Sequence, residues 1–326
     1  MKSRRTMLNV LAAATLAVAG WAAGTASANA QTTAGAPLRI VVPYPPGGSS
    51  DRAARILAEA LQPRLGTPVV VENITGAGGR LALRQLAGTG DTNVLVMVNP
   101  ALMVVAPLVY KNNGYDPERD FQPVSQVSTY EFAAAVASAV PVRELNHLLA
   151  WVKANPEKAN VGVPATGSLP HFFAMMVGQA AKAPVQVVGY RGSAPLATDL
   201  LGGHLPVAID SLEGLQQLHE GGKLRILATS GAKRSVANIP TFKEAGLDIT
   251  ATGWNVLYAK AGMPAAFTDR LAREIADLMT QASVRQQFTA AKAEPVSASR
   301  DQTRRMLESF KAQWAPVIRQ SGLQFE

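Results

Sequence analysis

Two serines and an aspartate directly follow a pair of glycines early in the chain, and together they could bind an anion. Gly47, Gly48, Ser49, Ser50 and Asp51 come after a β-branched run and before an amphipathic segment. Glycine permits a tight turn, and serine and aspartate are favoured at helix N-caps. A turn that opens a helix presents free backbone N–H groups at the positive end of the helix dipole. The stretch predicts either a site for a carboxylate or phosphate, or an ordinary strand-to-helix turn.

The spacing of these residues does not support nucleotide binding or a serine nucleophile. The stretch matches neither G-x-G-x-x-G nor G-x-x-x-x-G-K-[ST], and it lacks the G-x-S-x-G elbow of serine hydrolases. The chain does contain the members of a Ser-His-Asp set, namely Ser49 or Ser50, His171, and Asp51 or Asp210. Nothing in the sequence orders them as a catalytic triad. An exported α/β hydrolase or transferase that uses a loop serine is therefore the alternative interpretation.

A second turn of small residues repeats this arrangement later in the chain. Thr166, Gly167 and Ser168 follow a short apolar run and precede an apolar helical segment. Their hydroxyl and backbone groups could bind an anion, or they could only form the turn. His171 lies one helical step further on, where it could reach the same ligand or serve as a cap or surface residue.

Two more candidates stand at the ends of apolar runs. Tyr190 is followed by Arg191, which could pair with a carboxylate or lie on the surface. Asp210 closes a buried run, where an acid is costly unless it is paired or faces a cleft. The position of Asp210 favours a functional role.

The elements around these residues indicate an α/β fold. Short strand-like runs, several of them followed by a turn of small residues and helical spacing, lie at residues 40–42, 68–73, 94–98, 160–163, 185–188, 205–209 and 224–229. A second glycine loop, with Gly78 and Gly79, follows the run at 68–73. This alternation predicts mostly parallel sheets flanked by helices, with the ligand crevice at the carboxyl ends of the strands. A short helix is also expected over residues 241–245.

We expect two lobes that face each other across a cleft. The chain is expected to cross between them near residues 126–129 and to return near residues 249–252. Lobe 1 would then comprise residues 31–127 plus 252–326, and lobe 2 residues 128–251.

Composition narrows the chemistry further. The chain has no cysteine, and its four histidines lack the spacing of metal ligands, so neither a cofactor nor a metal is expected. The formal net charge is +8, of which the three cations before residue 6 contribute +3, leaving +5. The remaining cations are dispersed, which argues against nucleic acid as a partner.

The first 30 residues are typical of a signal peptide. Lys2, Arg4 and Arg5 precede an apolar run, and an A-x-A cleavage signal ends at Ala30. The mature protein is therefore expected in the periplasm. The string SRRTML at residues 3–8 resembles a twin-arginine signal, so that route and the general export route are both open.

Several strings resemble the Bug (TctC-type) solute-binding proteins of tripartite tricarboxylate transporters. They occur in order along the mature chain: VVPYPPGGSSD at 41–51, VVVEN at 69–73, GAGG at 76–79, YDPERDF at 115–121, YRGSAP at 190–195, DLLGG at 199–203 and ATGW at 251–254. The resemblance implies a non-enzymatic, two-lobed periplasmic binding protein of type II-like fold. It would act as a monomer that captures a small organic carboxylate and delivers it to membrane permease subunits. In some relatives a sensor recognises the closed form instead.

The resemblance also implies which residues contact the ligand. In the first lobe these would be Tyr44, Gly48, Ser49, Ser50 and Asp51, with Gly78 and Gly79 nearby. In the second lobe they would be Thr166, Gly167, Ser168, His171, Tyr190 and Asp210. Because the backbone would recognise one carboxylate, a dicarboxylate, tricarboxylate, amino acid, nicotinate-like acid and aromatic acid are all compatible with this set.

Overall fold

The computed structural model describes residues 36–326, so the predicted signal peptide at residues 1–30 lies outside the described part of the chain. All the elements below lie within this described part of the chain. Among the described residues, no helix combines the length and the apolar character needed to cross a membrane.

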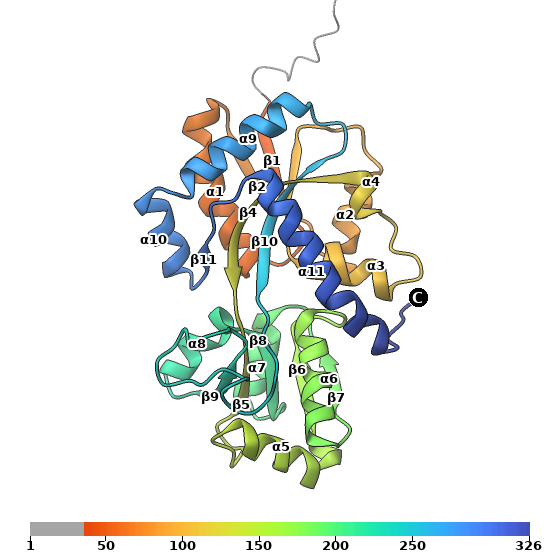
Figure 1. Cartoon of the computed structure of the whole chain (residues 1–326), viewed down its shortest axis with the longest axis vertical. Helices are drawn as coiled ribbons and strands as arrows, with labels where there is room; N and C mark the ends of the chain where they lie inside the picture. Colours follow the sequence, from red (N-terminus) through yellow and green to blue (C-terminus); the bar gives the residue numbers. More distant parts are fainter. Residues whose placement is uncertain (1–35) are drawn as a thin grey trace, which may run out of the picture. The chain divides into compact units, whose positions relative to one another are not determined.

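The first sheet, in the upper half of Figure 1, has the strand order β11-β4-β10-β3-β1-β2. Its strands are β1 (Leu38–Val42), β2 (Val69–Asn73), β3 (Val94–Val98), β4 (Phe121–Tyr130), β10 (Gly253–Lys260) and β11 (Glu294–Pro295). β1 lies inside the sheet with Ile40, Val41 and Val42 completely buried, as expected for a β-branched strand covered on both faces.

Helices cover this first sheet. They are α1 (Ser49–Leu65), η1 (Ala77–Gly79), α2 (Arg80–Ala87), η2 (Ala101–Val105), α3 (Ala106–Val109), α4 (Pro117–Asp120), α9 (Ala265–Leu278), α10 (Ala282–Ala290) and α11 (Arg300–Gln320). α1 buries Ala54, Leu57 and Leu61 at helical spacing. Burying each of these leucines contributes about 2 kcal/mol. The helix ends at Gly66, whose left-handed conformation (φ 66°) lets its N–H bond to Gln62 O at 3.1 Å.

The second sheet has the order β7-β6-β8-β5-β9. Its strands are β5 (Phe132–Ala137), β6 (Asn160–Val163), β7 (Gln186–Gly189), β8 (Val207–Ser211) and β9 (Leu224–Thr229). Its helices are α5 (Leu145–Ala154), η3 (Pro156–Lys158), α6 (Leu169–Ala181), α7 (Ser193–Leu201) and α8 (Leu212–Glu220). The expected α/β fold with two helix-flanked sheets is therefore confirmed.

Two details differ from expectation. Both sheets are mixed: β1 with its neighbours and β6 with its neighbours are parallel, whereas β10 runs antiparallel to β3 and β4, and β5 antiparallel to β8 and β9. The reason is that the chain passes from one sheet to the other through β4 and β5 and returns through β9 and β10, so outgoing and returning strands lie side by side. The expected helix at residues 241–245 is wrong, because Phe242 N bonds to Thr229 O at 2.8 Å and holds this segment against β9 as turns.

Aromatic side chains join the cores of the two sheets. Phe173 on α6 contacts Trp314 on α11 edge to face, with ring centroids 5.7 Å apart. Trp314 in turn stacks on Phe310, and Phe310 meets Trp254 of β10. These rings belong to one hydrophobic cluster with members from both sheets, so the two halves share packing on the side where the strands cross.

Candidate functional site

Asp51 holds the loop between β1 and α1 in shape. Its Oδ2 accepts from Gly47 N at 2.9 Å and from Arg55 Nε at 3.0 Å, and its Oδ1 accepts from Arg55 Nη2 and Asn73 Nδ2. Asn73 Nδ2 also donates to Tyr44 O at 3.0 Å, so the second strand is tied to the same loop. Burial by itself would raise the pKa of Asp51, but the bonds from Arg55, Gly47 and Asn73 outweigh it and lower that pKa. The buried carboxylate therefore stays ionised and shapes the loop.

The first N–H groups of α1 have no side-chain cap. The helix begins at Ser49, and its N-cap, Gly48, provides no side-chain acceptor. The N–H groups of Ser49, Ser50 and Asp51 belong to the first turn, where no intrahelical carbonyl is available. Because these donors lie at the positive end of a 17-residue helix, they suit a carboxylate oxygen.

The two serine hydroxyls are bonded to an amide. Ser50 Oγ donates to Asn255 Oδ1 at 2.7 Å, and Asn255 Nδ2 donates to Ser49 Oγ at 2.9 Å and to Ser128 Oγ at 3.0 Å. Asn255 is completely buried on β10. In the described part of the chain no hydrogen bond joins either serine to His171, so the Ser-His-Asp set is not assembled as a triad.

Tyr44 and the second glycine loop flank the start of α1. Tyr44 Oη donates to Asn99 Oδ1 at 2.7 Å, and burial raises the pKa of this phenol well above its usual value, so it stays protonated. Gly79 is buried with φ 96°, and a Cβ there would lie 3.0 Å from Pro43 O. Gly78 is exposed with φ 67° and open space around its Cβ position. The structure thus gives Gly79 a packing role beside the first loop.

The second-sheet turn before α6 is closed by its own residues. Ser168 Oγ donates to Ala165 O at 2.7 Å, and Gly167 N donates to His171 Nδ1 at 3.3 Å. Burial lowers the pKa of His171, so the neutral ring accepts at Nδ1 and carries its proton on Nε2. Thr166 is exposed, whereas Ser168 and His171 are buried. A Cβ on Gly167 would lie 3.5 Å from Phe325, which places this turn next to the C-terminal segment.

The turn before α7 adjoins the turn before α6. Gly192 N donates to Pro164 O at 2.9 Å. Tyr190 Oη donates to Asp199 Oδ2 at 2.8 Å, and burial together with this carboxylate raises the pKa of Tyr190 to about 12. A Cβ on Gly192 would lie 3.6 Å from Pro45 Cγ, so the turn before α7 also comes close to the first loop.

Asp210 lies at the end of β8 with only 3% of its surface exposed. Its Oδ1 accepts from Ser211 N at 2.7 Å, while its Oδ2 has no hydrogen-bond partner among the described residues. Burial raises the pKa of Asp210 to about 6, an effect that neighbouring Ser193 and Ser211 reduce. The functional role that the sequence predicts for Asp210 stays a prediction.

An ion pair that the sequence analysis missed brings the two halves together. Arg52 Nη2 on α1 lies 3.0 Å from Glu213 Oε1 on α8, and the Glu213 side chain is 1% exposed. Burial raises the pKa of Glu213 to about 7, although Arg52 and the hydroxyl of Ser49 favour its charged form. Arg52 also donates to Gly47 O. Residues from the first loop and from the start of α8 therefore share one site.

The missed residues gave weak sequence signals. Glu213 is an acid three residues after Asp210 in the first turn of a helix, and Arg52 directly follows the serine loop. Either could have been interpreted as an exposed helix residue. Asn99 follows the apolar run at residues 94–98, and Asn255 interrupts a later apolar run. Only the fold shows that Asn99 bonds to Tyr44 and that Asn255 bonds to Ser49 and Ser50.

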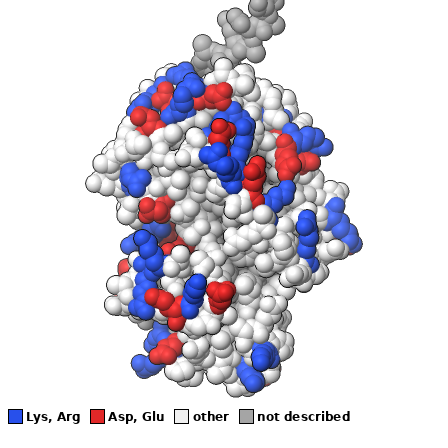
Figure 2. Space-filling model, in the orientation of Figure 1, with Lys and Arg blue, Asp and Glu red and all other residues white. Residues whose placement is uncertain are grey.

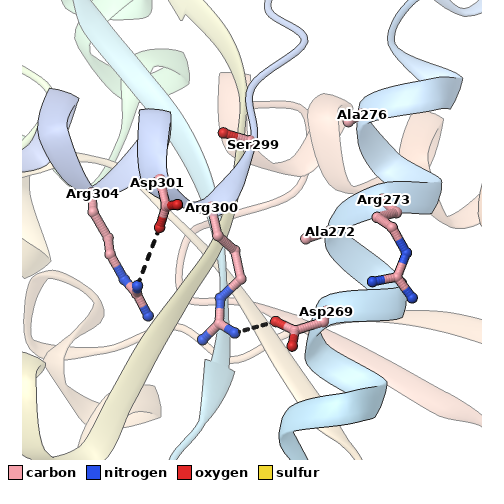
Figure 3. A pocket seen from close by; sticks show the side chains of 8 residues that line it. All are labelled: Asp269, Ala272, Arg273, Ala276, Ser299, Arg300, Asp301 and Arg304. Atoms are coloured by element: carbon pink, nitrogen blue, oxygen red, sulfur yellow. Dashed lines mark hydrogen bonds and ion pairs between the residues drawn. The ribbon is translucent and has the colours of Figure 1, made fainter.

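Two surface pockets lie away from this site. One, of about 320 Å³, lies between α9 and the start of α11, and two of its three arginines form ion pairs, Arg300 with Asp269 and Arg304 with Asp301 (Figure 3). The other, of about 230 Å³, is lined by β4, β10 and α11 residues including Trp254. Basic and acidic side chains are interspersed on the face seen in Figure 2. No group of three or more His, Asp or Glu side chains suited to a metal ion occurs within residues 36–326.

Comparison with known proteins gives a consistent result. A family profile described as "Tripartite tricarboxylate transporter family receptor" matches residues 53–323. Protein BugT of Bordetella pertussis is 32% identical over 313 residues, covering 94% of this chain and 95% of BugT. A UPF0065 protein of Cupriavidus necator is 30% identical over 327 residues, covering 99% of each chain.

Solved structures agree with the sequence relatives. The R. palustris protein Rpa4515, solved with adipate, superimposes with a TM-score of 0.84 at 29% identity, covering 88% of this chain and 98% of that one. The periplasmic binding protein BugD superimposes with a TM-score of 0.82 at 27% identity, covering 89% and 99%. The resemblance inferred from the sequence is confirmed: the chain belongs to the Bug (TctC) family of periplasmic solute-binding receptors.

Proposed function

We propose that this receptor captures a small organic carboxylate between lobe 1, residues 31–127 plus 252–326, and lobe 2, residues 128–251. The first lobe would contact it through Tyr44, Gly48, Ser49, Ser50 and Asp51, with Gly78 and Gly79 nearby. The second lobe would contribute Thr166, Gly167, Ser168, His171, Tyr190 and Asp210. Asp51 would act by shaping the loop, because protein donors already occupy both of its oxygens.

The observation that carries this proposal is the uncapped N-terminus of α1. The first three N–H groups of α1 have no intrahelical partners, and the Asp51 side chain holds the loop before them in shape. Gly192 and Glu213 of the second lobe lie close to the same region. A carboxylate bound there would accept charge-assisted hydrogen bonds from the first lobe while touching the second. Ligand binding would thereby favour the closed arrangement of the lobes. The adipate bound by the R. palustris relative supports a carboxylate as the ligand class.

The receptor would act by binding and handing over its ligand, without catalysis. We infer that the closed form delivers the acid to membrane permease subunits of a tripartite tricarboxylate-type transporter, as the family's description suggests. The transport energy would come from those subunits. The protein is expected to reach the periplasm through the signal peptide at residues 1–30 and to work there as a monomer.

A thermal-shift screen tests the proposal. The mature chain, residues 31–326, is heated with a panel of small carboxylates, each paired with its primary amide as a matched neutral control. A ligand at 100 times its dissociation constant should add about 2.7 kcal/mol to the free energy of unfolding. Stabilisation by acids and not by their amides is the expected result. Equal stabilisation by acid and amide, or none by any acid, would contradict the proposal.

A further inference from the structure

Two acids in the site carry more negative charge than the protein itself balances. Asp210 is 3% exposed, and the Glu213 side chain is 1% exposed. Glu213 is paired with Arg52, whereas no ion pair to Asp210 occurs among the described residues. A buried carboxylate without a cation is costly, and natural proteins keep one mainly where a ligand or reaction uses it.

The oxygens of these acids are also incompletely used. Asp210 Oδ2 and Glu213 Oε2 are both buried and have no hydrogen-bond partner in the described part of the chain. A Cβ on Gly214 would lie 3.6 Å from Asp210 Oδ2 and 3.7 Å from Ser193 Cβ, so the free oxygen lies where the starts of α7 and α8 meet. Gly192, next to Ser193, is the residue that approaches Pro45 of the first loop. The unused acceptors therefore lie beside the region where the two lobes meet.

The charge balance around Asp210 and Glu213 disfavours a ligand with a second negative charge. Within residues 36–326, the one ion pair made by Asp210 or Glu213 is that of Glu213 with Arg52. Tyr130 of β4 adds no positive charge, and its own pKa is raised by burial and by both acids. A ligand with two carboxylates would place its second negative charge near this surplus. A ligand with one carboxylate and one cationic group would neutralise it.

We propose that the natural ligand is an amino acid, an inference that rests on the carboxylate-receptor function proposed above. Its carboxylate lies at the N-terminus of α1, and its ammonium group binds Asp210 Oδ2 beside Glu213. The ammonium supplies the three N–H donors and the positive charge that these two acids lack. Asp210 thereby becomes the residue that selects amino acids over the corresponding simple acids and dicarboxylates.

The pH dependence follows from the groups that face Asp210. These are Glu213 on α8, Tyr130 on β4 and, through Glu213, Arg52 on α1. Because burial raises the pKa of Asp210 to about 6, the acid loses its charge as the pH falls through this value. Amino-acid affinity should therefore fall at acidic pH, whereas a ligand held by the protonated acid would bind more tightly there.

Isothermal titration calorimetry on the mature chain provides the test. The probes are matched in size: L-alanine with propionate, and L-glutamate with glutarate, each at about pH 8 and about pH 5. An amino acid should bind at least about 10-fold more tightly than its deaminated partner at the higher pH. Asp210→Asn should remove this preference, so that the variant binds an amino acid no more tightly than its deaminated partner.

The possible results separate the two proposals. Preference for glutarate or propionate over the matching amino acid, or tighter binding at the lower pH, would overturn the ammonium site and leave the carboxylate receptor standing. Absence of binding by every acid in both sets would overturn both. If Asp210→Asn fails to fold, Glu213→Gln serves as the second variant. It should weaken amino-acid binding more than binding of the deaminated acid, and an equal loss for both would contradict the inference.

Discussion

Arg52 and Glu213 form an ion pair of 3.0 Å that links the first helix of one sheet to a helix of the other. The two residues lie far apart in the sequence, and each lies next to a predicted ligand loop. The pair is asymmetric, since the Glu213 side chain is almost completely buried and that of Arg52 is 36% exposed. Removing the cation should therefore matter more than removing the acid.

We expect Arg52→Gln to lower the free energy of unfolding by about 1–3 kcal/mol, because it leaves the Glu213 carboxylate buried without a cation. Adding Glu213→Gln should restore part of the loss, since an uncharged amide needs no cation. Urea unfolding at neutral pH measures both variants. The matched control is Arg64→Gln, which breaks a more exposed pair with Asp277 and should cost less than about 1 kcal/mol. Equal losses for Arg52→Gln and Arg64→Gln would contradict the buried-pair interpretation.

Asp51→Ala should weaken ligand binding by about 10-fold without unfolding the protein, because it frees the loop that four hydrogen bonds now hold. Calorimetry gives the affinity, and circular dichroism confirms the fold. Asp277→Ala, at an exposed carboxylate on α9, is the control and should bind normally. Unchanged affinity in Asp51→Ala would show that this loop is not the ligand site.

Asp210→Asn should stabilise the ligand-free protein at alkaline pH. Burial raises the pKa of Asp210 to about 6, above its usual value, so its contribution to stability is fully present below the usual pKa and is lost as the pH rises through about 6. The asparagine variant escapes this loss. At about pH 8 it should be more stable by about 1–3 kcal/mol, and the difference should shrink towards about pH 4. A difference independent of pH, measured by urea unfolding, would show that the acid is not strained by burial.

Gly79→Ala should destabilise the protein by about 2 kcal/mol or more, because its φ of 96° is unfavourable for alanine and the new methyl group would press on Pro43 O and Leu102. Gly78→Ala offers a matched control with a positive φ and open space, and should cost about 1 kcal/mol. Thermal unfolding compares the two. Equal losses would mean that only backbone conformation, and not the close approach to Pro43 and Leu102, requires glycine at position 79.

Local signals in the sequence predicted the elements well. The strands at residues 94–98 and 160–163 have the predicted bounds, since both are short apolar runs closed by turn-forming residues. The serine loop was correctly expected to open α1. The mixed sheets were not predicted, because antiparallel pairing of β4 with β10 depends on the path of the chain between the sheets rather than on either segment.

The site was predictable only where its residues are local. The turn from Gly47 to Asp51 has a recognisable composition, and Asp210 stands out because it closes an apolar run. The Arg52–Glu213 pair and the bonds from Asn255 to Ser49 and Ser50 join segments that meet only after folding. No periodicity or motif encodes such pairs, so they required the structure.

Removing one backbone N–H at the start of α1 tests most directly whether a carboxylate binds there. Ser49→Pro deletes the N–H at the first helical position, where proline is tolerated, and Gly48 before it is already extended (φ −79°, ψ 173°). Ser49→Ala removes the same hydroxyl and keeps the N–H. Calorimetry with the acid that stabilises the protein most should show that Ser49→Pro binds about 10-fold or more weakly than Ser49→Ala. Equal affinity of the two variants would contradict recognition of the ligand carboxylate by the first turn of α1.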